Sequence, residues 1–162
     1  MGTIFLVGKG ERLLGKIVLN GLTEYSIDGM FHEDYYTNME WEVEYTDEFG
    51  SWWDTLSEEE QISIDAVVRL LERFGPALGY PYSSAIQTSR HSNLRELRIQ
   101  HGGRPLRALY AFDPRRTAIL LIGGDKTGKD NWYKSYVPVA DRLYDEHIDQ
   151  LKNEGVINGD SI

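Results

Sequence analysis

The chain contains no cysteine, no long apolar run and no excess of positive charge. Without cysteine, disulfides and thiol nucleophiles are excluded, and the commonest structural zinc ligands are missing. No stretch of about 18 apolar residues occurs, so the sequence predicts no transmembrane helix. The N-terminus also lacks the basic and apolar segments of a secretory signal. We therefore expect a cytoplasmic protein, and its 162 residues are enough for one domain.

The net charge of −9 counts against broad, non-specific binding of nucleic acid, which normally requires a basic surface. The acidic residues gather in segments 40–60 and 141–154, whereas one basic cluster lies between them. This cluster consists of Arg90, Arg95, Arg98, Arg104, Arg107, Arg115, Arg116, Lys126 and Lys129. Any function on nucleic acid must depend on this local cluster.

Residues 1–38 differ from the rest of the chain, because they are rich in glycine and show no sustained apolar period. After Met39, the alternation in Trp41–Tyr45 predicts a strand. We expect Met39 to be the native start, with 1–38 as an N-terminal extension and 39–162 as the functional domain. The alternative is that the first segment forms a small hairpin at the sheet edge.

The pattern after Met39 predicts a strand, two helices, three strands and a final helix. A short helix is expected at 47–56, and Ser57 with Glu60 forms a capping-box signature for a second helix with the apolar stripe Ile64, Val67, Val68, Leu71 and Phe74. Gly75-Pro76 ends that helix, and a loop follows to about residue 92. The later strands are expected at 94–100, 105–112 and 117–122, followed by a polar loop at 123–131.

The final helix is expected to carry Pro138 in its first turn and an apolar stripe of Ala140, Leu143, Tyr144, Ile148 and Leu151. Together the elements predict an α+β fold with a mostly antiparallel sheet. Two helices would pack on one face, which leaves the other face partly open, and a helix would end the chain.

A two-residue turn at Gly102-Gly103 would place Arg98 directly opposite Arg107. The same register puts Leu97, Ile99, Leu106 and Ala108 on the opposite, core face. Like charges facing each other cost roughly 0.2–1 kcal/mol, and a sheet tolerates them best when an anion lies between them. A phosphate fits two guanidinium groups well. The alternative is that Glu96, on the same face, neutralises the pair internally.

Residues 123–130 resemble a phosphate-binding loop, but Asp130 stands where that motif has serine or threonine. We therefore interpret the segment as a flexible loop that brings Lys126 to the edge of the sheet face. Trp132 and Tyr133 follow directly, and either could stack on a base or anchor the start of the helix. The four histidines lack metal-binding spacing, so no metal site is expected; His91 either approaches the site or is a solvated loop residue.

Several short motifs in this order resemble the RelE/ParE toxin superfamily, most closely its HigB-like, phage-derived branch of type II toxin–antitoxin systems. They are Leu94-Arg95-Glu96-Leu97-Arg98, Arg107-Ala108-Leu109-Tyr110 and the Lys126-Thr127 loop before a final helix. The resemblance covers about residues 39–153. It implies a RelE-like α+β fold and a ribosome-dependent mRNA endoribonuclease, in which the ribose 2′-hydroxyl attacks the phosphate without a metal or other cofactor. It also implies a helix-turn-helix antitoxin as partner.

By the same resemblance, the catalytic residues are Arg107, Arg98, Lys126 and Tyr133, with Arg107 stabilising the phosphate and Arg98 positioning or assisting it. Further contacts to RNA are expected from Arg95, Arg104, Lys129 and Trp132. Two other functions remain open. The chain could be a non-catalytic ParE-like toxin that inhibits a protein such as gyrase, or a degenerate relative that only binds its antitoxin.

Overall fold

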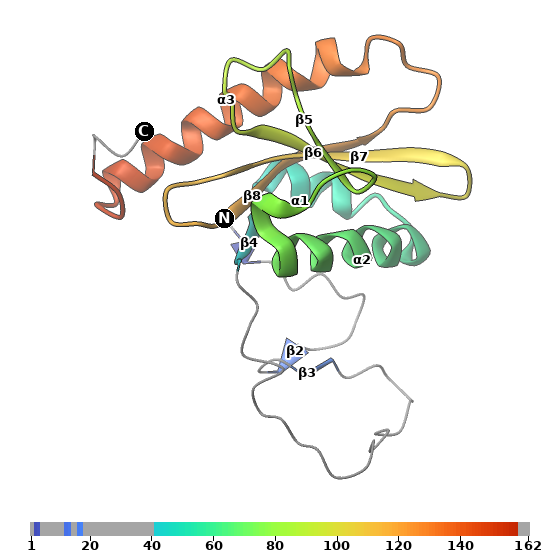
Figure 1. Cartoon of the computed structure of the whole chain (residues 1–162), viewed down its shortest axis with the longest axis horizontal. Coiled ribbons are helices and arrows are strands. Elements are labelled where there is room, and N and C mark those ends of the chain that lie inside the picture. Colours follow the sequence, from blue (N-terminus) through green and yellow to red (C-terminus); the bar gives the residue numbers. More distant parts are fainter. Residues whose placement is uncertain (1, 4–11, 14–15, 18–40, 159–162) are drawn as a thin grey trace.

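A mixed sheet with helices on both faces forms the core of the computed structural model, which describes residues 2–3, 12–13, 16–17 and 41–158 (Figure 1). The strands run in the order β1-β4-β8-β7-β6-β5, and all neighbours are antiparallel except the parallel pair β4–β8. Their bounds are β1 Gly2–Thr3, β4 Val43–Tyr45, β5 Ser83–Ala85, β6 Leu94–His101, β7 Arg104–Phe112 and β8 Ala118–Asp125. The predicted α+β fold is confirmed.

Two short strands, β2 (Arg12–Leu13) and β3 (Lys16–Ile17), pair with each other apart from this sheet. Most of segment 1–38 lies outside the described residues, and so does Met39. The division into an extension and a domain at residue 39 therefore stays a prediction.

The helices lie on opposite faces of the sheet. Figure 1 shows α1 (Asp47–Trp53) and α2 (Glu58–Phe74) on one side and α3 (Trp132–Asn153) crossing the other. None of the helices in the described part of the chain is long and apolar enough to cross a membrane. The arrangement gives two separate apolar cores, one on each side of the sheet.

Local signals explain where α1 and α2 begin and end. Thr46 caps α1 by accepting a hydrogen bond from the Phe49 amide, and Ser57 and Glu60 form the predicted capping box at 3.2 and 2.9 Å. Gly75 ends α2 with a φ of 53°, and a side chain there would collide with Trp41. A short 3₁₀ turn, η2 (Gly75–Ala77), follows.

The predicted apolar stripes are largely confirmed. In α2, Ile64, Val67, Val68 and Leu71 are buried, but Phe74 is 45% exposed and does not belong to the core. All five predicted positions of α3 are buried. The α2 stripe packs on Leu97, Ile99, Leu106 and Ala108, whereas α3 packs on Leu94, Leu109, Ala111, Ile119 and Leu121.

Several predicted boundaries are wrong, including the end of α1, which is Trp53 and not residue 56. Helix α3 begins at Trp132, so Pro138 lies inside the helix and not in its first turn. The early start buries Trp132. Pro138 has no amide hydrogen to donate to the carbonyl of Lys134, but both residues are exposed, so water can donate to that carbonyl instead. Strand β8 extends to Asp125, three residues into the predicted loop. Strand β5 and η2 lie in the segment predicted to be a loop.

Candidate functional site

The predicted arginine pair exists. The register of β6 and β7 sets Arg98 directly opposite Arg107, and the neighbouring pairs Ile99–Leu106 and Leu97–Ala108 are also as predicted. Glu96 lies beside both arginines: its Oε1 accepts a hydrogen bond from Arg98 at 2.9 Å, and its Oε2 lies 3.6 Å from Arg107 Nε. Internal neutralisation by Glu96, one of the two alternatives, is therefore what the structure shows.

Glu96 is the centre of this group of side chains. It is buried, and besides the two arginines it accepts hydrogen bonds from Ser84 Oγ at 2.8 Å and Tyr133 Oη at 2.7 Å. Burial raises the pKa of Tyr133, and the neighbouring Glu96 carboxylate raises it further. The Tyr133 hydroxyl thus keeps its proton at neutral pH and can serve as a hydrogen-bond donor. We call Glu96, Arg98, Arg107 and Tyr133 the arginine cluster.

Arg107 is more deeply placed than the sequence predicted. The face was expected to be open at this position, but Arg107 is only 3% exposed. The early start of α3 is the reason, because it brings Tyr133 over Glu96. Arg107 Nη1 donates to the carbonyl of Leu106 at 2.9 Å, while Nε has no hydrogen-bond partner among the described residues. Nε has only the longer ion pair with Glu96 Oε2 at 3.6 Å, so a closer anionic oxygen would be stabilised at this place.

Two glycines of β8 let tryptophans approach the sheet from both sides. A methyl group on Gly123 would lie 2.0 Å from the Trp52 ring, and one on Gly124 would lie 2.9 Å from Tyr136 and 3.0 Å from Trp132. Gly124 is also the residue that pairs with Arg107 across β7 and β8. The absence of a side chain at Gly124 thus sets how closely the start of α3 covers the arginine cluster.

We predict that Gly124→Ala lowers the free energy of unfolding by about 1–3 kcal/mol, because the added methyl overpacks a closely stacked contact. Trp132 and Tyr136 stack at 4.3 Å and leave little room to move. Urea denaturation measures the effect. Gly79→Ala is the matched control, since the nearest atom to a methyl group there is 4.0 Å away. Equal stability of the two variants would contradict the prediction.

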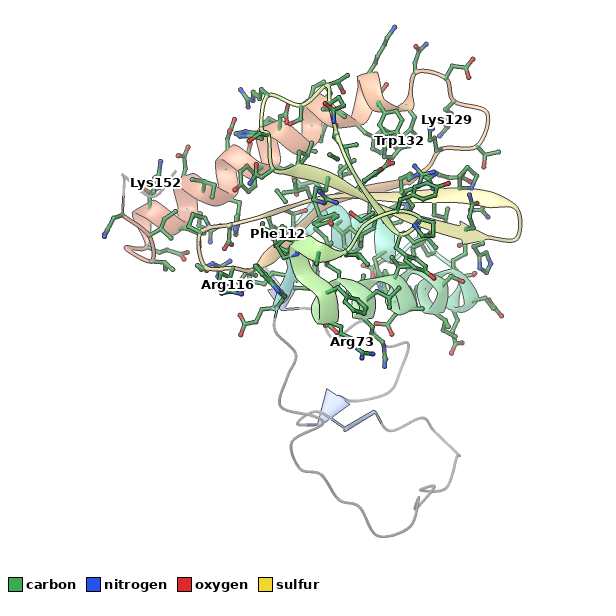
Figure 2. All side chains as sticks on the ribbon, in the orientation of Figure 1. Arg73, Phe112, Arg116, Lys129, Trp132 and Lys152 are labelled. Carbon is green, nitrogen blue, oxygen red and sulfur yellow. The ribbon has the colours of Figure 1, made fainter. Side chains whose placement is uncertain are left out.

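Beside the arginine cluster, the loop after β8 forms a hollow of about 330 Å³ lined by Pro105, Lys126, Gly128, Lys129, Asp130 and Tyr133. Lys126 Nζ lies 4.7 Å from the centre of the Tyr133 ring, so this cation reaches the edge of the arginine cluster. Figure 2 shows Lys129 and Trp132 at the same end of α3. Tyr133 borders the hollow and also contacts Glu96, and therefore connects the two.

The structure does not bring the remaining predicted RNA contacts into this group. Arg95 points to the other side of the sheet and donates to Ser83, Tyr110 and the carbonyl of Leu78. Arg104 pairs with Glu60 of α2 at 2.6 Å and with Asp125 at 2.9 Å. Trp132 is 1% exposed and anchors the start of α3, so its indole offers no free face to a base.

The three histidines that the structure describes each contact a side chain of another element. His91 bonds Asp145 of α3, His101 contacts Ser63, and His147 bonds Asp113. No group of three or more histidine or acidic side chains suited to hold a metal ion occurs among the residues that the structure describes.

Sequence reasoning missed that Glu96 joins all parts of the site. Its alternation with Arg98 was visible, but its contacts with Ser84 and Tyr133 are not local. Ser84 lies on a three-residue strand without an apolar pattern, so no signal in the sequence could have found it.

Comparison with known proteins gives consistent matches. Residues 51–145, more than half of the chain, match the family model described as "Phage derived protein Gp49-like". The chain is 39% identical over 106 residues to a protein of Mycobacterium tuberculosis named "Putative toxin HigB2", a match that covers 64% of this chain and 53% of that protein. It is 41% identical over 92 residues to "Putative toxin HigB3" of the same organism, covering 56% and 79%. The chain thus spans about half the length of HigB2.

Proposed function

We propose that this chain, which belongs to the phage-derived Gp49-like family and is similar to HigB toxins, is the toxin of a toxin–antitoxin system and cleaves mRNA. The observation that carries the proposal is the arginine cluster itself. In a chain of net charge −9, two arginines face each other on one sheet surface, with Lys126 and Lys129 beside them. These four cations outnumber the carboxylates of Glu96 and Asp130 among them, and the remaining positive charge suits one phosphate of an RNA backbone.

The chemistry needs only groups of the chain and the substrate. The ribose 2′-hydroxyl oxygen attacks the adjacent phosphorus, and the bond from phosphorus to the 5′-oxygen breaks. A 2′,3′-cyclic phosphate forms, and the proton lost by the 2′-hydroxyl is balanced by the proton gained by the leaving 5′-oxygen. Arg107 and Arg98 stabilise the charge that develops on the phosphate, Lys126 adds a further cation, and Tyr133 supplies a protonated hydroxyl.

The geometry also suggests how the phosphate enters. Arg107 is buried beneath Tyr133, whereas Lys126 and Lys129 line the adjacent hollow. In this proposal the phosphate approaches through the hollow, Tyr133 moves away from Glu96, and Arg107 Nε, which has only a long ion pair with Glu96, gains a closer anionic acceptor. Messenger RNA on the ribosome is the proposed substrate, the cytoplasm the proposed location, and a helix-turn-helix protein the proposed antitoxin.

Induction in a bacterial host tests this function. We expect the wild-type chain to arrest growth and to create new 5′ ends inside translated messages. Lys126→Ala should reduce those cuts about tenfold or more, because a charge-assisted hydrogen bond contributes roughly 1.5–3 kcal/mol. Lys126 is partly exposed, so the variant should fold normally.

Lys152→Ala is the matched control, since it removes the same charge at the opposite end of α3 (Figure 2). The control should cut like wild type. Growth arrest without new RNA ends would replace the proposal with a protein target such as gyrase. No arrest from folded wild-type protein would leave a relative that only binds its antitoxin.

A further inference from the structure

The segment between α2 and β5 carries two exposed tyrosines that the proposed reaction does not use. Tyr80 is 80% exposed, more than any other large apolar side chain in the described residues, and Tyr82 is 45% exposed. Burying an aromatic ring stabilises a fold, so a ring left this exposed contributes little to stability. Because Tyr80 lies beside the arginine cluster, its exposed ring is available to a ligand that binds there.

Arg98 joins Tyr80 to the cluster. The Arg98 guanidinium carbon lies 5.5 Å from the centre of the Tyr80 ring, while Arg98 Nη1 donates to Glu96 at 2.9 Å. The backbone is tied at the same place, because the Arg98 amide donates to the Tyr82 carbonyl at 2.8 Å. One side of the Tyr80 ring thus faces a cation that belongs to the proposed phosphate site, and most of the ring remains open to solvent.

The topology sets these groups in a row across the sheet. Tyr80 precedes the edge strand β5, Arg98 lies on β6, Arg107 on β7, and Lys126 follows β8. Neighbouring strands lie about 4.8 Å apart, so the row from β5 to β8 extends for about 14 Å. An aromatic ring at one end, followed by two arginines and then a lysine, suits a base and the adjacent backbone phosphates of a single strand of RNA.

We infer that Tyr80, supported by Arg98, is a stacking site for an unpaired nucleobase next to the phosphate that is cleaved. This inference rests on the proposed function and adds a binding subsite to it. The charges favour RNA over an apolar protein segment, because Arg98 lies against the ring and a nucleotide supplies a base and a phosphate together. Base–aromatic stacking tolerates any base, so the site contributes affinity and position rather than sequence specificity.

Binding of an uncleavable probe tests the inference separately from catalysis. The probe is a short fluorescein-labelled, single-stranded 2′-O-methyl oligoribonucleotide, titrated with the full chain and followed by fluorescence anisotropy. Tyr80→Ala should bind about tenfold more weakly than wild type. Tyr80→Phe keeps the ring and should bind like wild type. Phe74→Ala removes an aromatic ring that is also exposed, at the far end of α2, and should have no effect.

A second probe separates stacking from charge. An abasic oligonucleotide with the same backbone should bind wild type and Tyr80→Ala equally, because it offers phosphates but no bases. Unchanged binding of the first probe by Tyr80→Ala, or no binding by wild type, would overturn the subsite. The subsite would also be overturned if Tyr80→Ala bound the probe like wild type but no longer captured the antitoxin. If cleavage is absent in cells but probe binding depends on Tyr80, the subsite stands and only the proposed reaction fails.

Discussion

Replacing Arg107 with methionine is expected to lower RNA cleavage at least about 100-fold, because removing one preorganised donor from a charge-stabilising site has an effect of this size. Arg107 is the most buried cation of the site, and its Nε makes no hydrogen bond among the described residues, only the longer ion pair with Glu96 at 3.6 Å. Desolvation strengthens its interaction with a phosphate. Cleavage in a translation reaction, with RNA ends mapped by primer extension, measures the loss.

Folding must be separated from chemistry in this variant, since Arg107→Met leaves the buried Glu96 with one cation fewer. The double variant Glu96→Gln/Arg107→Met removes both charges and should unfold at a temperature close to that of wild type while remaining inactive. Arg116→Met is the charge-matched control, because Arg116 lies exposed at the turn between β7 and β8, away from the cluster (Figure 2). Full activity of a folded Arg107→Met variant would remove this residue from the mechanism.

The parts of the fold that local sequence determines were predictable. The Gly102-Gly103 turn determines the register of β6 and β7, and both glycines adopt the positive φ that such a turn requires. Once the register is known, side-chain alternation alone places Arg98 and Arg107 on one face. The capping box at Ser57 and Glu60 likewise identified the start of α2. These features each depend on residues close together in the sequence.

The parts that depend on distant contacts were not predictable. Helix α3 begins early because Trp132 packs over Gly124, a contact that no helix signal in the sequence reports. The early start of α3 also covers Arg107. Because this helix boundary was predicted too late, the site was predicted to be more open than it is. Arg104 was counted as free charge, yet it pairs with Glu60, 44 residues away in the sequence. Sequence reasoning identified the cluster of cations but not which of them are already paired.

The second large effect concerns stability. Asp113→Asn is expected to lower the free energy of unfolding by about 3 kcal/mol, because it removes the charge from a buried ion network. The Asp113 carboxylate is fully buried; it accepts from Arg115 at 2.6 Å and from His147 of α3 at 2.8 Å. The loss should lie at the lower end of the range for such pairs, since Arg115 keeps a second partner, Glu44, at 2.9 Å. Asp145→Asn, at an exposed pair with Arg90, should cost less than about 1 kcal/mol.

The same substitution predicts a pH dependence. Burial raises the pKa of Asp113, but the hydrogen bonds from His147 and Arg115 outweigh this effect and hold the pKa below its ordinary value. A carboxyl group with a lowered pKa stabilises the fold above its unfolded pKa of about 3.9, and the contribution is lost as the pH falls through the folded pKa. The stability difference between wild type and Asp113→Asn should therefore narrow as the pH falls below about 4. Urea denaturation across this range measures it, and a difference that grows on acidification would contradict the assigned network.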